Sequence, residues 1–248
     1  MNIRYIGHSG FLVTAESCSL LFDYYTGQLP AISPEKPLYI FCSHRHQDHF
    51  NPEIFSFTKL ADRVEYLLSY DIKLNSHFFS KYPEAVKIRE DGKIHSMRMD
   101  ECYVIDNLEI HTIQSTDEGV AFLVSVLPEQ KLIYHAGDLN WWVWPDDTKQ
   151  EYNNMTSMFC RFTERLEKLV KQSQREVDAA FIPLDPRQES CEFYGMRYYL
   201  EHVPMKEVFP MHFWEQYDII PRFIKAHGKE FPKTAIHTIK ERGQDYEI

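Results

Sequence analysis

The chain has 248 residues, of which 44% are hydrophobic and 15% aromatic, enough for one large domain or two small ones. This composition excludes a disordered chain, and no run of about eighteen apolar residues occurs, so no membrane span is expected. The 27 basic and 37 acidic residues give a net charge of −10, which disfavours general binding to nucleic-acid phosphates.

The five cysteines are scattered along the chain and never form a Cys-x-x-Cys pair. This spacing predicts neither a disulfide framework nor a thiolate zinc site. Residues 1–6 predict a strand and lack the apolar segment that is typical of a signal peptide. We therefore expect a protein of the reducing cytoplasm.

Short apolar runs separated by turn residues predict a strand-rich first half. Asn51 and Pro52 are typical of a helix start, because Asn caps the first turn and Pro fits the first helical position. The helix that they begin lies between the last two strands. The predicted strands are residues 3–6, 11–14, 19–22, 38–43 and 64–68.

In the second half, a strand series precedes a long amphipathic helix that contains residues 155–170. Helices at 194–202 and 219–226 then alternate with strands. No repeat or linker interrupts the chain, so we predict a single domain over residues 1–248, with two sheets between helices. The predicted strands are 99–105, 108–113, 120–127, 132–135, 178–183, 207–210 and 235–239.

Three histidines and one aspartate follow the strand at 38–43, in the segment His44-Arg45-His46-Gln47-Asp48-His49. In an extended segment, residues two apart point the same way, so His44 and His46 can bind one metal ion together. Asp48 and His49 follow where the chain turns, within reach of a second ion. The alternative is a solvated, His-rich loop.

Two distant positions offer further ligands. Asp138 ends the segment His135-Ala136-Gly137-Asp138, and a carboxylate there can bridge two cations. The alternative is an ordinary turn aspartate. His212 follows another predicted strand, and its alternative is a half-buried histidine among aromatic residues.

These segments together resemble the metallo-β-lactamase superfamily, especially its small bacterial branch of metal-dependent hydrolases, which includes ascorbate-phosphate lactonase-like proteins. The resemblance implies an α/β fold, a four-layer αββα sandwich, with a binuclear site at one sheet edge. The matching segments keep the family order and are Gly7-His8-Ser9-Gly10-Phe11-Leu12, Leu21-Phe22-Asp23, Ser43 to His49, His135-Ala136-Gly137-Asp138 and Pro210-Met211-His212-Phe213.

The resemblance also implies a role for each matched residue. His44 and His46 bind the first metal, and Asp138 bridges both metals. The second metal is bound by Asp48, His49 and His212. His8 and Asp23 are expected to support the ligands through hydrogen bonds rather than to bind metal.

One family ligand has no counterpart, because residues 114–119 contain no histidine. His111 lies nearby but inside the predicted strand. We favour Asp117 as the replacement, which would make the first site harder and shift its preference from zinc towards manganese or iron. The alternative is a first metal that is weakly held or absent.

The resemblance implies two divalent metal ions, with zinc as the first choice and manganese or iron as alternatives. Such a pair lowers the pKa of a bridging water, and the resulting metal-bridging hydroxide attacks a small ester, lactone, thioester or phosphoester. Asp48 is the expected catalytic residue, because one of its oxygens can orient the hydroxide. The predicted activity is therefore that of a hydrolase.

Residues for substrate binding are proposed from position alone. Trp141 and Trp142 follow the bridging carboxylate and can wall a substrate pocket, or they can pack in the core. Arg187 follows a strand end and can hold a carboxylate or phosphate, or it can form a surface salt bridge.

Three other functions compete with a hydrolase of small molecules. A nuclease of the superfamily is disfavoured by the acidic charge. A diiron oxidoreductase of that superfamily typically has glutamate where His46 stands and an appended flavin domain, and the chain has neither. A metal-poor, non-catalytic binding protein is the third, because of the missing histidine.

Overall fold

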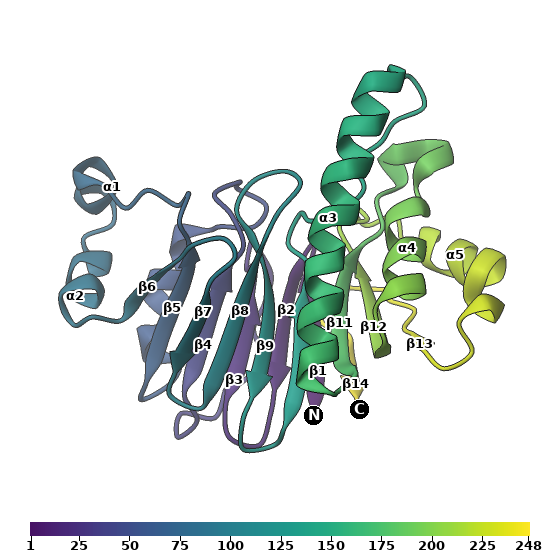
Figure 1. The fold of residues 1–248 in the computed structure, drawn as a ribbon. Helices are drawn as coiled ribbons and strands as arrows, with labels where there is room; N and C mark the ends of the chain where they lie inside the picture. Colours follow the sequence, from purple (N-terminus) through teal and green to yellow (C-terminus); the bar gives the residue numbers. More distant parts are fainter. The chain divides into compact units, whose positions relative to one another are not determined.

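A computed structural model describes residues 1–248, which divide into two compact units (Figure 1). Unit 1 comprises Met1–Met99 and Arg242–Ile248, and unit 2 comprises Asp100–Glu241. Each unit contains one seven-stranded sheet. The prediction of a single hydrolase domain over 1–248 stays a prediction.

The sheet of unit 1 has the order β14-β1-β2-β3-β4-β5-β6. Its first strands form an antiparallel meander, and β3 to β6 run parallel to one another. Parallel strands place their carboxyl ends at one edge, where side chains from successive loops can meet. The strands are β1 (Asn2–Gly7), β2 (Gly10–Thr14), β3 (Ser19–Phe22), β4 (Leu38–Cys42), β5 (Val64–Ser69), β6 (Ile94–Met97) and β14 (Asp245–Glu247).

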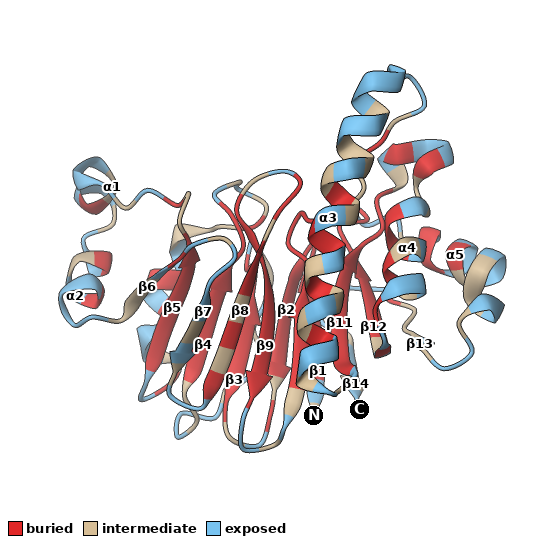
Figure 2. Cartoon of the chain, viewed as in Figure 1, coloured by how far each residue is buried: buried red, intermediate tan, exposed pale blue.

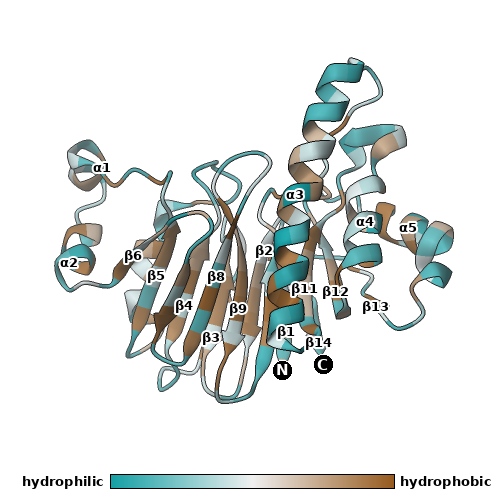
Figure 3. Ribbon diagram, viewed as in Figure 1, coloured by the Kyte–Doolittle hydropathy of each residue, from teal (hydrophilic) through white to brown (hydrophobic).

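Three short helices pack on one face of this sheet: η1 (Pro52–Lys59), α1 (Ser76–Lys81) and α2 (Glu84–Glu90). Alternate residues of the strands, such as Ile40 and Tyr66, point into this core because side chains alternate between the faces of a sheet. Phe55 of η1 stacks on Tyr66 with ring centroids 5.3 Å apart. The apolar strands are visible in Figure 3.

The sheet of unit 2 has the order β13-β12-β11-β10-β9-β8-β7. Strands β7 to β10 form an antiparallel meander, whereas β10 to β13 are parallel. The carboxyl ends of β8, β10, β11 and β12 consequently share one edge. The strands are β7 (Cys102–Ile105), β8 (Leu108–Gln114), β9 (Val120–Val126), β10 (Lys131–His135), β11 (Val177–Pro183), β12 (Met205–Met211) and β13 (Ala235–Ile236).

Helix α3 (Lys149–Ser173) is the longest element of unit 2 and begins at a capping box, in which Thr148 and Glu151 satisfy each other's backbone N–H groups. Figure 2 shows a buried stripe along this helix. The residues of the stripe recur at helical spacing and are Phe159, Phe162, Thr163, Leu166 and Val170. The other helices of the unit are η2 (Pro186–Cys191), α4 (Tyr194–His202), α5 (Ile219–His227) and η3 (Gly228–Glu230).

Most predicted elements are confirmed, and the differences have local causes. The predicted strand 99–105 begins only at Cys102, after Asp100, whose φ of 60° is incompatible with a strand. The segment after Pro52 is a 3₁₀ helix rather than an α-helix. Helices α1 and α2 and strands β6 and β14 are short elements that the apolar pattern missed. The predicted last strand, 235–239, has only two residues, Ala235–Ile236.

Candidate metal centre

The candidate residues of unit 1 lie at one edge of its sheet. His8 lies in the turn between β1 and β2, Asp23 follows β3, and the histidine segment follows β4. The carboxyl ends of β3 and β4 lie at the same edge because these strands are parallel, with Phe22 opposite Phe41. The turn before β2 lies at this edge too, because the start of β2 pairs with the end of β3. His8 and Asp23 have left-handed φ angles of 52° and 41°, a strained conformation that is typical of functional sites.

Asp23 holds the base of the histidine segment. It is fully buried and accepts hydrogen bonds from the backbone N–H of Ser43 (2.7 Å), the Ser43 hydroxyl (2.6 Å) and Nδ1 of His49 (2.7 Å). A carboxylate on Nδ1 fixes the tautomer and ring orientation of an imidazole and leaves Nε2 for a metal. The contact suits the supporting role expected of Asp23, and that role stays a prediction.

His44 and His46 bring two ring nitrogens together, with His44 Nε2 3.0 Å from His46 Nδ1. Nδ1 of His44 lies 3.0 Å from the Ser43 hydroxyl, which orients the ring. Two imidazole nitrogens at this separation can bind one ion at ordinary metal–nitrogen distances of about 2.0–2.1 Å. The two nitrogens are therefore close enough to share one ion, and their binding of a metal stays a prediction.

Asp48 and His49 form a second group, together with His8. One ligand atom from each of these three residues lies within 4.8 Å of the others, so they can share an ion. Nε2 of His8 lies 3.2 Å, and Nε2 of His49 3.9 Å, from Oδ2 of Asp48. Burial by itself would raise the pKa of Asp48, but the hydrogen bond from His8 and the charges of His49 and His8 lower it well below its usual range. The position of His8 suits a ligand as well as a support.

In unit 2, Asp117 follows β8 and Asp138 follows β10. One carboxylate oxygen of each lies within 4.8 Å of the other, although Asp117 is exposed and Asp138 is buried. Such close carboxylates favour a cation between them. His111 lies inside β8, with Nε2 3.1 Å from Glu109, so it does not reach this edge.

His212 follows β12, is buried, and has a left-handed φ of 63°. Its Nε2 lies 3.5 Å from Oδ1 of Asp138, and its Nδ1 donates to Asp185 at 2.9 Å. Burial alone would raise the pKa of Asp185, but hydrogen bonds from His212 and Arg187 lower it to about 2. Asp185 stays ionised at neutral pH and fixes the imidazole.

The residues predicted to bind substrate have different surroundings. Trp141 stacks on Phe159 of α3 and donates its indole N–H to Thr156, which favours the packing interpretation. Trp142 lies beside the site: its indole N–H donates to the backbone oxygen of Asp138 at 2.9 Å, and its ring centroid is 5.4 Å from that of His212. Arg187 forms the ion pair with Asp185.

A buried network holds the loops of this edge together. Thr116 accepts the backbone N–H of Asn140, and the Asn140 side-chain amide donates to Gln188. Gln188 in turn donates to the backbone oxygens of Trp141 and Val143. The loops after β8, β10 and β11 are consequently fixed relative to one another.

Sequence reasoning did not assign a role to Asp185 or Ser43. Both follow a fully buried apolar strand directly or within two residues, as His44 does, and this shared position is the signal that would have found them. The pattern of strand-end polar residues would also have indicated Asp23.

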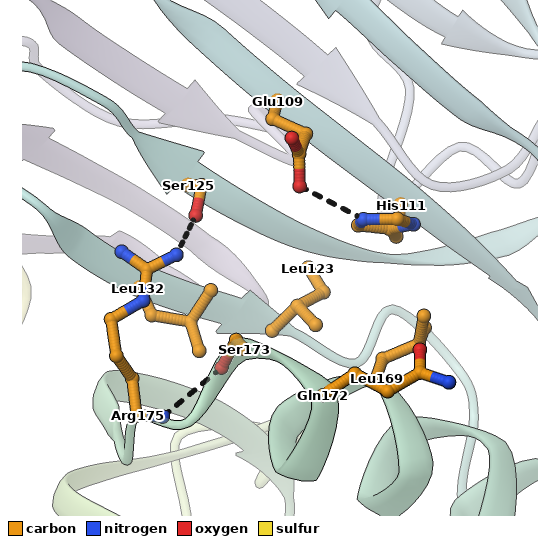
Figure 4. A pocket seen from close by; sticks show the side chains of 9 residues that line it. All are labelled: Glu109, His111, Leu123, Ser125, Leu132, Leu169, Gln172, Ser173 and Arg175. Atoms are coloured by element: carbon orange, nitrogen blue, oxygen red, sulfur yellow. Dashed lines mark hydrogen bonds and ion pairs between the residues drawn. The ribbon is translucent and has the colours of Figure 1, made fainter.

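A cavity of about 230 Å³ lies elsewhere in unit 2, between the sheet and the C-terminal part of α3 (Figure 4). Glu109 and Leu132, which help to line it, belong to the starts of β8 and β10, whereas Asp117 and Asp138 follow the ends of those strands. No residue predicted for metal or substrate lines it. We therefore exclude this cavity from the metal chemistry.

The chain matches a known sequence family and a curated relative. A family profile for a beta-lactamase superfamily domain matches residues 2–151, which is more than half of the chain. The chain belongs to this family. A UPF0173 metal-dependent hydrolase from Opitutus terrae is 28% identical over 146 residues, which cover 56% of this chain and 63% of that protein. The match thus spans less than two thirds of this relative.

Solved structures share the fold of the superfamily over the whole chain. The metallo hydrolase Igni18 from Ignicoccus hospitalis has a TM-score of 0.61 at 14% identity and is covered to 98%. CmlA from Streptomyces venezuelae, a diiron β-hydroxylase, has a TM-score of 0.61 at 11% identity and is covered to 54%. The predicted fold class, an α/β fold of the metallo-β-lactamase type, is confirmed.

The branch of the superfamily is not fixed by these similarities, so the likeness to ascorbate-phosphate lactonases stays a prediction.

Helix α3 is the longest helix, but it is amphipathic. None of the helices combines the length and the apolar character that crossing a bilayer requires.

Proposed function

We propose that this protein is a metal-dependent hydrolase that acts on a small ester, lactone, thioester or phosphoester. One observation carries the proposal: each unit holds a histidine on a buried carboxylate and turns its Nε2 towards a second carboxylate. The first set is Asp23, His49 and Asp48, and the second is Asp185, His212 and Asp138. Carboxylate-fixed imidazoles beside carboxylates are a donor set for divalent metal ions. The names of the hydrolases described above support the same class of activity.

The proposed ligand assignment follows the family pattern. His44 and His46 bind the first ion, Asp48, His49 and His212 bind the second, and Asp138 bridges the two. We assign Asp117 to the first ion because its carboxylate approaches that of Asp138 and no histidine is available there. The donor set of imidazole and carboxylate suits zinc, and the oxygen of Asp117 makes manganese or iron the alternatives.

Two ions bound in this way would polarise the substrate and activate water near neutral pH. Asp48 is ionised at neutral pH, because its pKa is lowered, and its carboxylate can accept a hydrogen bond from the attacking water and orient it. Asp138 contributes negative charge and a second oxygen. The buried thiol of Cys42 is no competing nucleophile, because burial and the charges of Asp23 and Asp71 raise its pKa.

We further propose a small-molecule substrate and a cytoplasmic location. The net charge of −10 supports the first point, because it disfavours a nucleic-acid substrate. The scattered cysteines, all of them free, support the second.

Substitution of the bridging aspartate tests the function. Asp138→Ala should lose at least one equivalent of bound metal and nearly all hydrolysis, because neither ion keeps its shared oxygen. The measurements are metal analysis of the purified protein and a screen of lactones, thioesters and phosphodiesters with zinc and manganese each supplied. Asp146→Ala changes an exposed aspartate of the same unit and is the control.

Two results would contradict the proposal. Unchanged metal content in Asp138→Ala would refute the bridging role. Less than one metal equivalent in the wild-type protein, with no hydrolysis on metal addition, would instead favour a non-catalytic binding protein.

A further inference from the structure

An exposed tryptophan lies two residues after His212. Trp214 leaves 41% of its surface accessible, and its φ of 50° is in the left-handed region. His212 and Glu215 share this conformation, with φ angles of 63° and 60°. A bulky side chain there is strained, and an exposed indole adds little to folding. Strain of this kind concentrates at functional sites.

The contacts of Trp214 hold its ring in one orientation. The Arg187 guanidinium lies over the indole, with Cζ 4.7 Å from the ring centroid. The Trp214 ring meets the His212 ring nearly edge-on, with centroids 5.6 Å apart at 85°. Arg187 is itself fixed, because its Nε donates to both carboxylate oxygens of Asp185 at 3.0 Å. The exposed indole is thus preorganised by contacts that also reach the histidine.

A second indole contacts the same histidine. The centroid of the Trp142 ring is 5.4 Å from that of His212, and its N–H donates to the backbone oxygen of Asp138. Trp142 is partly exposed. Two indoles beside one candidate ligand provide an apolar surface next to the proposed reacting centre.

The charge near Trp214 argues for an uncharged group in contact with the ring. Arg187 is the cation beside it, and the fully buried carboxylate of Asp185 neutralises this half-exposed guanidinium in an ion pair. An anionic substituent would have to compete with that carboxylate. An aromatic or branched aliphatic group gains contact with the indole and loses no ion pair.

We propose that Trp214 is a specificity-determining residue that contacts an aromatic or other large apolar group of the substrate, close to the bond that is cleaved. This inference rests on the proposed hydrolase function and names its substrate class. Arg187 is a positioning residue that holds the indole and Asp185, and Trp142 extends the apolar surface.

The test compares Trp214→Ala and Trp214→Phe with the wild-type full chain, loaded with zinc. The substrates are 4-nitrophenyl phenylacetate and 4-nitrophenyl acetate, which differ in the aromatic acyl group. In Trp214→Ala, the ratio of kcat/KM for phenylacetate over acetate should fall about fivefold, mainly through KM, because the ring contact is lost. Trp214→Phe should retain most of the preference.

Tyr194→Ala is the matched control, because Tyr194 is also 41% exposed, belongs to the same unit and packs on Trp141. Its selectivity should equal that of the wild type. Zinc analysis of each variant separates recognition from metal binding: Trp214→Ala should keep the wild-type zinc content. A loss of zinc in Trp214→Phe as well would overturn the inference in favour of a structural role at His212.

A binding measurement makes the outcome independent of turnover. Titration calorimetry with phenylacetate and acetate should show tighter binding of phenylacetate to the wild type and loss of that preference in Trp214→Ala.

Two results overturn the inference and leave the hydrolase function standing. One is hydrolysis by Trp214→Ala with an unchanged ratio of kcat/KM for the two esters, and the other is equal binding of both acids by the wild type. Preferential binding of phenylacetate without any hydrolysis refutes the function alone. Changed self-association of Trp214→Ala with unchanged selectivity would assign the indole to a protein interface and overturn the inference.

Discussion

At the scale of single residues, each unit fixes a histidine by a buried carboxylate. Asp23 binds Nδ1 of His49, and Asp185 binds Nδ1 of His212. Both aspartates are completely buried, so each carboxylate depends on its hydrogen-bond donors for stability. The histidine gains a fixed tautomer, and Nε2 becomes the nitrogen that faces Asp48 or Asp138.

Asp185→Asn should therefore weaken metal binding. The amide has one acceptor oxygen instead of two and carries no charge, so it cannot hold both His212 and Arg187 as the carboxylate does. Zinc affinity should therefore fall about 10- to 100-fold. Competition with a fluorescent zinc chelator measures the affinity, and Asp218→Asn, at an exposed aspartate of the same unit, is the control. Equal affinity in both variants would show that Asp185 does not orient a ligand.

At the scale of elements, the edge strand β6 is attached to β5 by ion pairs as well as by backbone hydrogen bonds. Glu65 of β5 is buried and binds Lys93, His95 and Arg63. Burial alone would raise the pKa of Glu65, but the hydrogen bonds from these three residues lower it below its usual range. Because the pKa is lowered in the folded state, the ionised Glu65 contributes stability above its unfolded pKa of about 4.3.

Glu65→Gln should lower the free energy of unfolding by about 2 kcal/mol at pH 7, since hydrogen bonds to a charged group are lost. The difference from the wild type should shrink as the pH falls through the folded pKa of Glu65, because the wild-type carboxyl then becomes neutral too. Urea unfolding at pH 7 and pH 3 measures both effects, with the exposed Glu35→Gln as control. A difference that does not depend on pH would assign the loss to packing instead.

At the scale of the whole molecule, a bound metal should stabilise the native state, because the unfolded chain does not assemble the ligands. At a metal concentration about 100 times Kd, the gain is about 2.7 kcal/mol, which corresponds to roughly 5–11 °C in Tm for a chain of this size. Calorimetry of metal-depleted and zinc-loaded protein measures the shift. In Asp138→Ala, zinc should raise Tm only slightly. A rise equal to that of the wild type would mean that the zinc binds elsewhere.

The local sequence predicted much of the fold. Short apolar runs bounded by turn residues indicated most strands, helical spacing indicated α3, and Asn51-Pro52 indicated the start of η1. The short elements α1, α2 and β6 were missed because so few residues carry too weak a period. The pairing of His44 with His46 was predictable, because two residues apart in an extended segment is a local relation.

The sequence by itself determined the metal-ligand types, their position at strand ends and the resemblance to the superfamily, because these depend on residue identity and local order. Only the tertiary structure decided that Asp23 binds His49 across 26 residues and that Asp185 binds His212 across 27. It also placed Trp214 beside His212 and committed Arg187 to Asp185. The register of neighbouring parallel strands sets which strand ends meet, and that register depends on long-range packing rather than on any local pattern.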